Sequence, residues 1–139
     1  MYFEAKRNIQ TSPEKVWSIL TDTNTLQTKG FGILKIEGQI ALGNKIKVWS
    51  EASPNRAFPL RISTFRQPEL MVWEGGMPFG LFKGVRKFEL SPVREGCQFI
   101  MREDYSGALL GMIGKSIPDL QPSFEKFCDA LKRLSEGEK

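Results

Sequence analysis

The residues best suited to chemistry are an arginine and a glutamate on two strands predicted over residues 81–90 and 97–105. Side chains alternate between the two faces of a strand, so Arg86 falls on the apolar face of the first strand and Glu103 on that of the second. Opposite charges on an apolar face need partners, because an isolated buried charge is very costly. The two side chains are therefore predicted to form an ion pair that faces the interior.

The predicted pairing of the two strands brings these charges close together. If Leu90 pairs with Cys97, Gly84 comes opposite Glu103, and Arg86 lies on the diagonal, about 7–8 Å away at the backbone. Three roles are open to such a pair. It can fix the wall of the interior, it can orient a polar group of a mostly apolar ligand, or Glu103 can act as a general base.

Apolar and aromatic side chains accompany the predicted pair and are candidates to line a ligand site. Tyr105 is the polar group next to Glu103 and would assist it in acid or base chemistry. The other candidate ligand-binding residues are Phe82, Phe88, Phe99, Met101, Phe124 and Phe79. Phe79 belongs to a glycine-rich apolar segment, residues 75–82, which can gate a cavity, touch a membrane or fold onto the core.

The sequence contains no histidine, which limits the chemistry available to the chain. Histidine triads, histidine metal ligands and a histidine acid or base are excluded. Cys97 and Cys128 lie far apart and belong to no CxxC motif, so we interpret them as buried thiols. We expect no metal and no cofactor.

Charge and hydropathy narrow the class of protein further. The 139 residues carry 20 Lys and Arg against 16 Asp and Glu, a formal net charge of +4, and the cations are spread along the chain. This spread argues against nucleic acid as a partner. The sequence shows no apolar leader and no apolar run long enough to span a membrane. We therefore expect one cytoplasmic domain over residues 1–139 without stable membrane insertion, and the oligomeric state stays open.

The predicted elements place the charged pair in an antiparallel sheet. A strand over residues 2–10 is followed by two short helices and then by six strands bounded by turns, one of them at residues 53–56. Apolar residues at helical spacing over residues 120–134 predict a long C-terminal helix. This helix is the only predicted element long enough to cover the apolar face of the sheet. The expected fold is α+β, with about seven strands in the order β-α-α-β6-α.

Four segments resemble the motifs of a known superfamily. They are TSPEKVW at 11–17, PELMVW at 68–73, GVRKF at 84–88 and EDYSG at 103–107. With the order of the elements, they resemble the START-like SRPBCC superfamily, including its polyketide cyclase/dehydrase branch. The resemblance implies a helix-grip fold, in which a curved sheet wraps around a long C-terminal helix and encloses an apolar cavity.

The resemblance implies binding or transport of a small hydrophobic molecule, such as a lipid, polyketide or aromatic compound, as the leading function. One alternative is a polyketide cyclase or dehydratase that uses Glu103 with Arg86 and Tyr105. Another is a protein-interaction module with an exposed apolar surface around Trp49 and Phe79. Arg86 stands where the superfamily often has histidine, so the polar site of the implied cavity carries a permanent cation. This favours an acidic or carbonyl-bearing apolar ligand.

Overall fold

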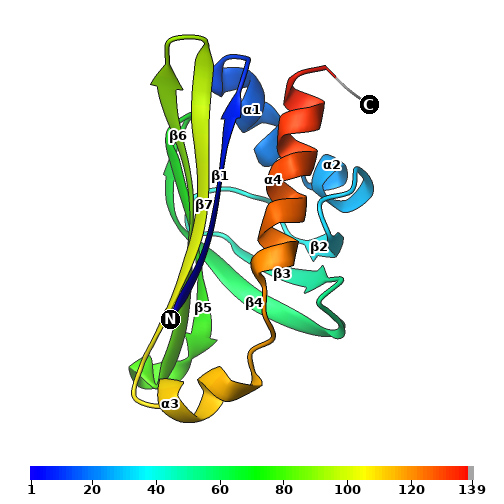
Figure 1. The fold of residues 1–139 in the computed structure, drawn as a ribbon. Coiled ribbons are helices and arrows are strands. Elements are labelled where there is room, and N and C mark those ends of the chain that lie inside the picture. The colour runs from blue at the N-terminus through cyan, green and yellow to red at the C-terminus, as the bar shows by residue number, and fades with distance from the viewer. Residues whose placement is uncertain (138–139) are drawn as a thin grey trace.

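The computed structural model describes residues 1–137, which form one antiparallel sheet and four helices (Figure 1). The strands are β1 (Tyr2–Ile9), β2 (Ile33–Glu37), β3 (Lys45–Ser50), β4 (Ser53–Arg66), β5 (Leu70–Met77), β6 (Phe82–Val93) and β7 (Gly96–Ser106). The helices are α1 (Pro13–Leu20), α2 (Thr23–Thr28), α3 (Leu110–Ile113) and α4 (Gln121–Ser135), with single 3-10 turns η1 (Pro78–Gly80) and η2 (Gly114–Ser116). The order of elements is the predicted one, with α3 as an additional short helix.

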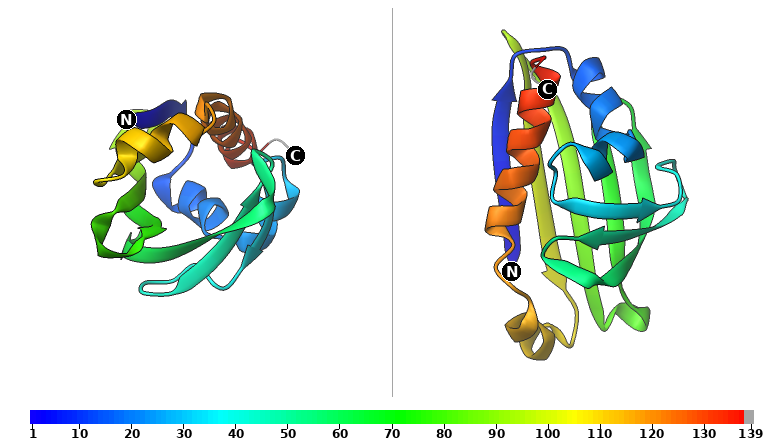
Figure 2. Two further views of the ribbon diagram at one scale, coloured as in Figure 1. Left: turned by 90° about the horizontal axis from the view of Figure 1, so that it is seen from below. Right: turned by 90° about the vertical axis from the view of Figure 1, so that its right-hand side faces the viewer.

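The sheet is strongly curved and its two edges come toward the same side of the molecule. Its seven strands pair in the order β1-β7-β6-β5-β4-β3-β2, so β1 and β2 are the edge strands. Helix α4 lies between these edges, beside β1 on one side and near α2 on the other (Figure 2). The predicted helix-grip arrangement of a curved sheet around the C-terminal helix is confirmed.

Polar contacts hold α4 to the elements on both of its sides. Arg7 of β1 donates a hydrogen bond from Nε to Oδ1 of Asp129 at 2.9 Å, and this bond raises the pKa of Arg7. On the other side, Arg133 donates from Nη2 to the carbonyl oxygen of Lys29, which follows α2, at 2.9 Å. Helix α4 is therefore held to the edge strand β1 on one side and to the end of α2 on the other.

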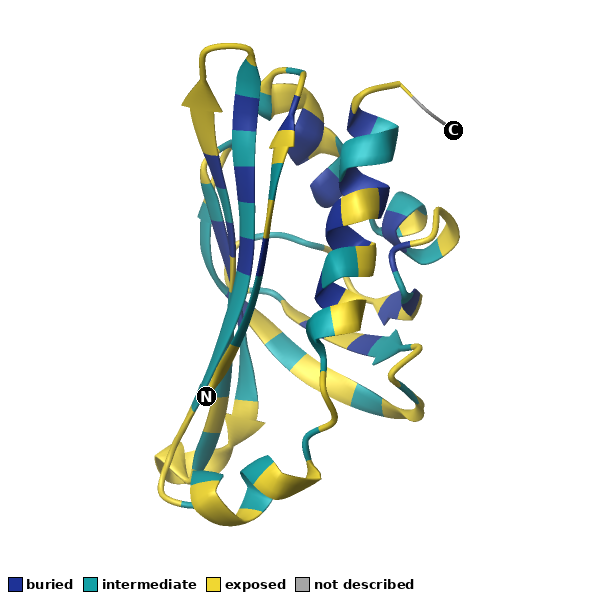
Figure 3. Cartoon of the chain, viewed as in Figure 1, coloured by how far each residue is buried: buried dark blue, intermediate teal, exposed yellow. Residues whose placement is uncertain are grey.

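Aromatic side chains fill the space between α4 and the sheet. Phe88 and Phe99, on adjacent strands, have ring centroids 5.8 and 6.4 Å from that of Phe127 on α4. Trp17 of α1 packs edge-on against Phe65 of β4 at 5.2 Å. Buried residues concentrate in the part of the sheet that α4 and α1 cover, whereas the end of the sheet near α3 carries few of them (Figure 3).

Local sequence signals set the helix starts. The side chain of Ser12 accepts a hydrogen bond from the backbone N–H of Lys15 at 3.2 Å, and Pro13 occupies the first turn of α1, as the sequence predicts. Before α4, Oδ1 of Asp119 accepts a hydrogen bond from the backbone N–H of Gln121 at 3.0 Å. Each cap satisfies an amide that has no partner inside its helix.

The structure differs from the prediction at the start of β4. The expected turn at residues 53–56 is the first part of a long strand, and the chain turns at residues 51–52. The segment from Ser53 to Leu60 pairs with β3 alone, because the pairing with β5 begins at Arg61. One side of β4 is free there, and a free side accommodates the prolines that make this segment resemble a turn.

The hairpin of β6 and β7 is also longer than predicted. Its turn lies at residues 94–95, and Leu90 pairs with Phe99 rather than with Cys97. Strand β5 pairs with β6 only as far as Glu89, so the end of the hairpin has one free side. Pro92 is tolerated in this part of β6, since no ladder bond is lost on the free side.

Candidate functional site

Arg86 and Glu103 face each other directly across β6 and β7. The predicted diagonal arrangement is wrong, because the turn position shifts the pairing by two residues. A shift of two keeps every side chain on its predicted face. Arg86 donates a hydrogen bond from Nε to Oε1 of Glu103 at 2.5 Å. Their side chains are 24% and 13% exposed, so the ion pair is largely withdrawn from water.

The ion pair belongs to a row of side chains that crosses the concave inner face of the sheet. Phe3 pairs with Glu103 on one side, and Trp73 pairs with Arg86 on the other. The guanidinium carbon of Arg86 lies 4.8 Å from the ring centroid of Phe124, in the first turns of α4, as a cation–π contact. The pair therefore lies between the middle of the sheet and the start of α4.

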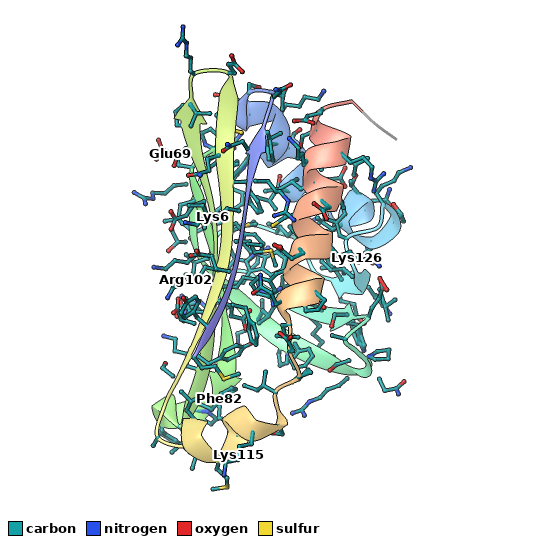
Figure 4. All side chains as sticks on the ribbon, in the orientation of Figure 1. Lys6, Glu69, Phe82, Arg102, Lys115 and Lys126 are labelled. Carbon is teal, nitrogen blue, oxygen red and sulfur yellow. The ribbon has the colours of Figure 1, made fainter. Side chains whose placement is uncertain are left out.

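Tyr105 and Phe82 continue the inner face beyond the start of α4, and we call this part of the sheet the open end. Their rings stack with centroids 5.8 Å apart, and Phe3 meets Tyr105 edge-on at 6.2 Å. Phe82 lies near the end of the sheet that α3 approaches (Figure 4). Burial, followed by the negative charge of Glu103, raises the pKa of Tyr105. The phenol therefore stays protonated at neutral pH and can donate a hydrogen bond.

Gly84 makes room for two of the candidate residues, a role that sequence analysis does not reveal. A Cβ at this position would lie 3.1 Å from Oε2 of Glu103 and 3.3 Å from Cε1 of Tyr105. Both distances are tighter than ordinary van der Waals contact, so the carboxylate and the phenol ring approach the backbone of β6 because no side chain stands there. A glycine inside an alternating strand is the signal that points to such a close approach.

Trp73 contributes a buried donor to the same row. Its side chain is buried, and its Nε1 has no hydrogen-bond partner among the described residues. Sequence analysis does not assign its face, and the pairing with Arg86 places it on the inner one. Within residues 1–137, Nε is also the only guanidinium nitrogen of Arg86 that makes a hydrogen bond. Of these donors, only Nε1 of Trp73 is buried, and buried N–H groups are usually paired.

The structure divides the predicted ligand-binding residues into three groups. Four are buried in the core under α4: Phe88, Phe99, Met101 and Phe124. Four are partly exposed around the start of α4 and the open end: Arg86, Glu103, Tyr105 and Phe82. Phe79 lies apart from both groups and is almost fully exposed between β5 and β6. The second group is therefore the part of the predicted site that a ligand can approach.

Two hollows of the protein surface lie away from the ion pair, one between α4 and Gly30 and the other beside the turn between β4 and β5. Neither is lined by Arg86 or Glu103. The part of the inner face that adjoins the pair and is partly exposed is the open end, with Tyr105 and Phe82.

Three further features bear on function. Among residues 1–137, no group of Cys, Asp and Glu side chains is placed to hold a metal ion. No helix in the described part of the chain combines the length and apolar character needed to cross a membrane. Trp49 is half-buried, and the Lys35 ammonium lies 5.2 Å from its ring centroid. Trp49 therefore presents less free apolar surface than Phe79.

A family comparison covers almost the whole chain. The family model described as polyketide cyclase / dehydrase and lipid transport matches residues 2–136. No curated protein matches the sequence. The match includes every element of the sheet and all four helices.

Solved structures share this fold at low sequence identity. Protein CV1439 from Chromobacterium violaceum superposes with a TM-score of 0.74 at 16% identity, covering 99% of each chain. Protein MLL2253 from Mesorhizobium loti gives 0.74 at 16% identity, covering 96% of each chain. DynU16, from the dynemicin biosynthetic locus, gives 0.72 at 15% identity, covering 98% of this chain and 47% of DynU16. Likeness at such identities shows the fold alone.

Proposed function

Because the chain belongs to the polyketide cyclase/dehydrase and lipid transport family, we propose that it binds a small, largely apolar molecule on the inner face of its sheet. The observation that carries this proposal is the Arg86–Glu103 pair, which is set among aromatic rings beside the open end. Arg86 holds the polar group of the ligand, and Tyr105 and Phe82 contact its apolar part. A few polar groups on an otherwise apolar surface are typical of small-molecule sites.

The donors of Arg86 suit a carboxylate or carbonyl oxygen. Glu103 engages Nε alone, which orients the guanidinium and leaves its two terminal nitrogens as donors. A guanidinium keeps its charge at all relevant pH values and binds a carboxylate through two parallel hydrogen bonds. The buried Nε1 of Trp73, on the same row, is a further donor for such a group. The proposed ligands are therefore apolar acids, ketones and esters.

Two variants on adjacent positions of β6 test this role. Arg86→Met removes the proposed anchor, and Lys87→Met removes an exposed cation from the opposite face of the same strand. Binding of a fluorescent fatty acid should weaken about tenfold or more in Arg86→Met, because a hydrogen bond to a charged group contributes about 1.5–3 kcal/mol. Lys87→Met should bind like the wild type.

A neutral ligand serves as the control for head-group recognition. The matching fatty alcohol should bind the wild type and Arg86→Met about equally, since it lacks the carboxylate. Circular dichroism of each variant checks that the fold is retained, and native mass spectrometry of the purified protein looks for a bound molecule. Equal affinity of Arg86→Met and Lys87→Met for the acid would contradict the proposal.

A cyclase or dehydratase is the second candidate, and the surroundings of Gly84 favour it. There a carboxylate, from Glu103, and a protonated phenol, from Tyr105, lie side by side on the inner face. One group that accepts a proton and one that donates a proton are what acid and base catalysis requires. Glu103→Gln should abolish turnover of a cyclisable polyketide analogue without preventing its binding. Turnover that persists in this variant rules out Glu103 as the base.

A further inference from the structure

Two segments far apart in the sequence form one end of the molecule, which we call the apolar tip: residues 75–84 and residues 105–118. The first joins β5 to β6, and the second contains α3 and η2. The backbone N–H of Leu109 donates to the carbonyl oxygen of Leu81 at 2.8 Å, which joins the two segments. Both lie at the end of the sheet away from α1 (Figures 1 and 2).

The apolar tip exposes large apolar side chains from both segments. Their exposed fractions are 97% for Phe79, 71% for Met112, 44% for Met77 and 37% for Leu81. Single exposed apolar residues are ordinary on protein surfaces, but several together at one end mark a contact surface. These side chains belong to a loop and a short helix at the same end of the sheet, so they can contact one deformable surface together.

The charges of the apolar tip all have one sign. Its two segments contain Lys83 and Lys115 and no aspartate or glutamate. Lys115 is exposed in η2 (Figure 4), and Lys83 contacts Glu74, just outside the tip, at 2.7 Å. Lys115 is therefore the cation of the tip that makes no ion pair among the described residues, and exposed apolar side chains beside such a cation complement a surface that is apolar inside and negatively charged outside.

The backbone at Phe79 presents its ring to the outside. Phe79 has φ 61° and ψ 24°, the left-handed conformation that few residues other than glycine and asparagine adopt readily. Pro78 and Gly80 flank it, and the three residues form the single turn η1. The left-handed conformation of a bulky residue costs folding free energy, and the exposed ring of Phe79 does not offset this cost by packing in the core. This points to a role for the ring in contact with a partner.

From these observations we propose that the apolar tip docks on an anionic lipid bilayer, with Phe79, Met77, Leu81 and Met112 entering the boundary between headgroups and acyl chains. Lys115 contacts the headgroups. The open end of the inner face adjoins the rest of the tip, because Phe82 and Tyr105 belong to both. The proposal stands whether or not the inner face binds a ligand, since it concerns the outer surface of this end.

Vesicle flotation with a matched pair of variants tests the docking. Phe79→Asn removes the ring at a position whose backbone asparagine tolerates, and Leu42→Asn removes another exposed apolar side chain, 64% exposed, from the turn between β2 and β3. On vesicles of phosphatidylcholine and phosphatidylglycerol in equal parts, Phe79→Asn should bind about tenfold or more weakly. Leu42→Asn should bind like the wild type.

The lipid charge separates the contribution of Lys115. Lys115→Gln should weaken binding to the phosphatidylglycerol vesicles about fivefold, as expected for one lysine near an anionic surface. Vesicles of phosphatidylcholine alone should bind this variant and the wild type equally. Equal binding of wild type and Phe79→Asn to the anionic vesicles overturns the proposal.

A dye attached to the tip reports insertion directly. Cys97 and Cys128 are both buried, so a maleimide dye on folded Phe79→Cys labels the new thiol. Its emission should shift to the blue on anionic vesicles, and the same dye on Leu42→Cys should not shift. Unshifted emission at position 79 overturns the proposal. Dimerisation that depends on Phe79 without lipid, seen by sedimentation velocity, also overturns it in favour of a second copy of the chain.

Discussion

Removing one member of the Arg86–Glu103 pair should destabilise the protein more than removing both. Arg86→Met leaves a largely buried carboxylate without its cation, and Glu103→Leu leaves a largely buried guanidinium without its anion. The double variant replaces both charges by apolar side chains on a face that is already aromatic. Its interior then contains no uncompensated charge at this point.

The burial of the Arg86–Glu103 pair determines how much free energy of unfolding each variant loses. Breaking a fully buried ion pair costs about 3–5 kcal/mol, because the remaining charge has lost both water and partner. Both side chains keep some contact with water, so we expect about 2–3 kcal/mol for each single variant. Replacing a pair by packed apolar residues is often neutral, so the double variant should unfold within about 1 kcal/mol of the wild type. The coupling energy is then about 3–6 kcal/mol.

Urea unfolding followed by tryptophan fluorescence measures all four proteins, provided that the m values agree. Lys87→Met, on the opposite face of β6, is the control and should leave the free energy of unfolding unchanged. Single variants as stable as the wild type would refute the view that the pair is withdrawn from water. A double variant whose loss equals the sum of the single losses would refute the coupling. A stable double variant that no longer binds the fatty acid would show that ligand recognition, rather than stability, retains the pair.

Three further predictions concern titration, packing and reactivity. Burial raises the pKa of Tyr105, so as pH rises the unfolded state loses the phenolic proton before the folded state does. In Tyr2→Phe, where Tyr105 is the only tyrosine, the free energy of unfolding should therefore fall as pH rises above about 10. Urea midpoints measured across pH test this. Leu131 is buried on α4, so Leu131→Ala should lower the free energy of unfolding by about 2–5 kcal/mol. Leu42→Ala, at an exposed turn, should change it by less than about 0.5 kcal/mol, and denaturant midpoints compare the two variants. Burial raises the pKa of Cys128 to about 12, so mass spectrometry should find it modified by a thiol reagent only after unfolding, and modification of the native protein would contradict its burial.

The fold could be predicted because burial follows the periodicity of the sequence. Along β7, Cys97, Phe99 and Met101 are buried, while the residues between them are partly exposed. Along α4, the apolar stripe faces the sheet. The errors occur where prolines suggested turns: Pro54 and Pro92 lie within strands because one side of each strand is free there. Whether a strand has a free side depends on the length of its neighbour, which periodicity does not report.

The candidate site could be predicted in its residues but not in its geometry. Strand register depends on the position of the turn, and a shift of two residues changed every partner while preserving every face. The face of Trp73 could not be assigned, because the sequence predicts only a short strand there, over residues 70–74, which is too short to show alternation. The closeness of Glu103 and Tyr105 to Gly84 depends on side-chain packing between strands, which no local pattern describes.

The start of α4 decides how much of the inner face stays open. Strand β7 ends at Ser106 and α4 begins only at Gln121, so the intervening residues leave the face above Tyr105 uncovered. A helix that began directly after β7 would add about 1.5 Å per residue, more than enough to bury Arg86 and Tyr105 completely. Pro118 disfavours such a helix, because the residue before a proline avoids helical conformation, and the glycines of the segment lower its helix propensity. The same residues form part of the apolar tip. The accessible ion pair and the exposed tip thus have one structural cause, although a ligand titration and a vesicle titration test them separately.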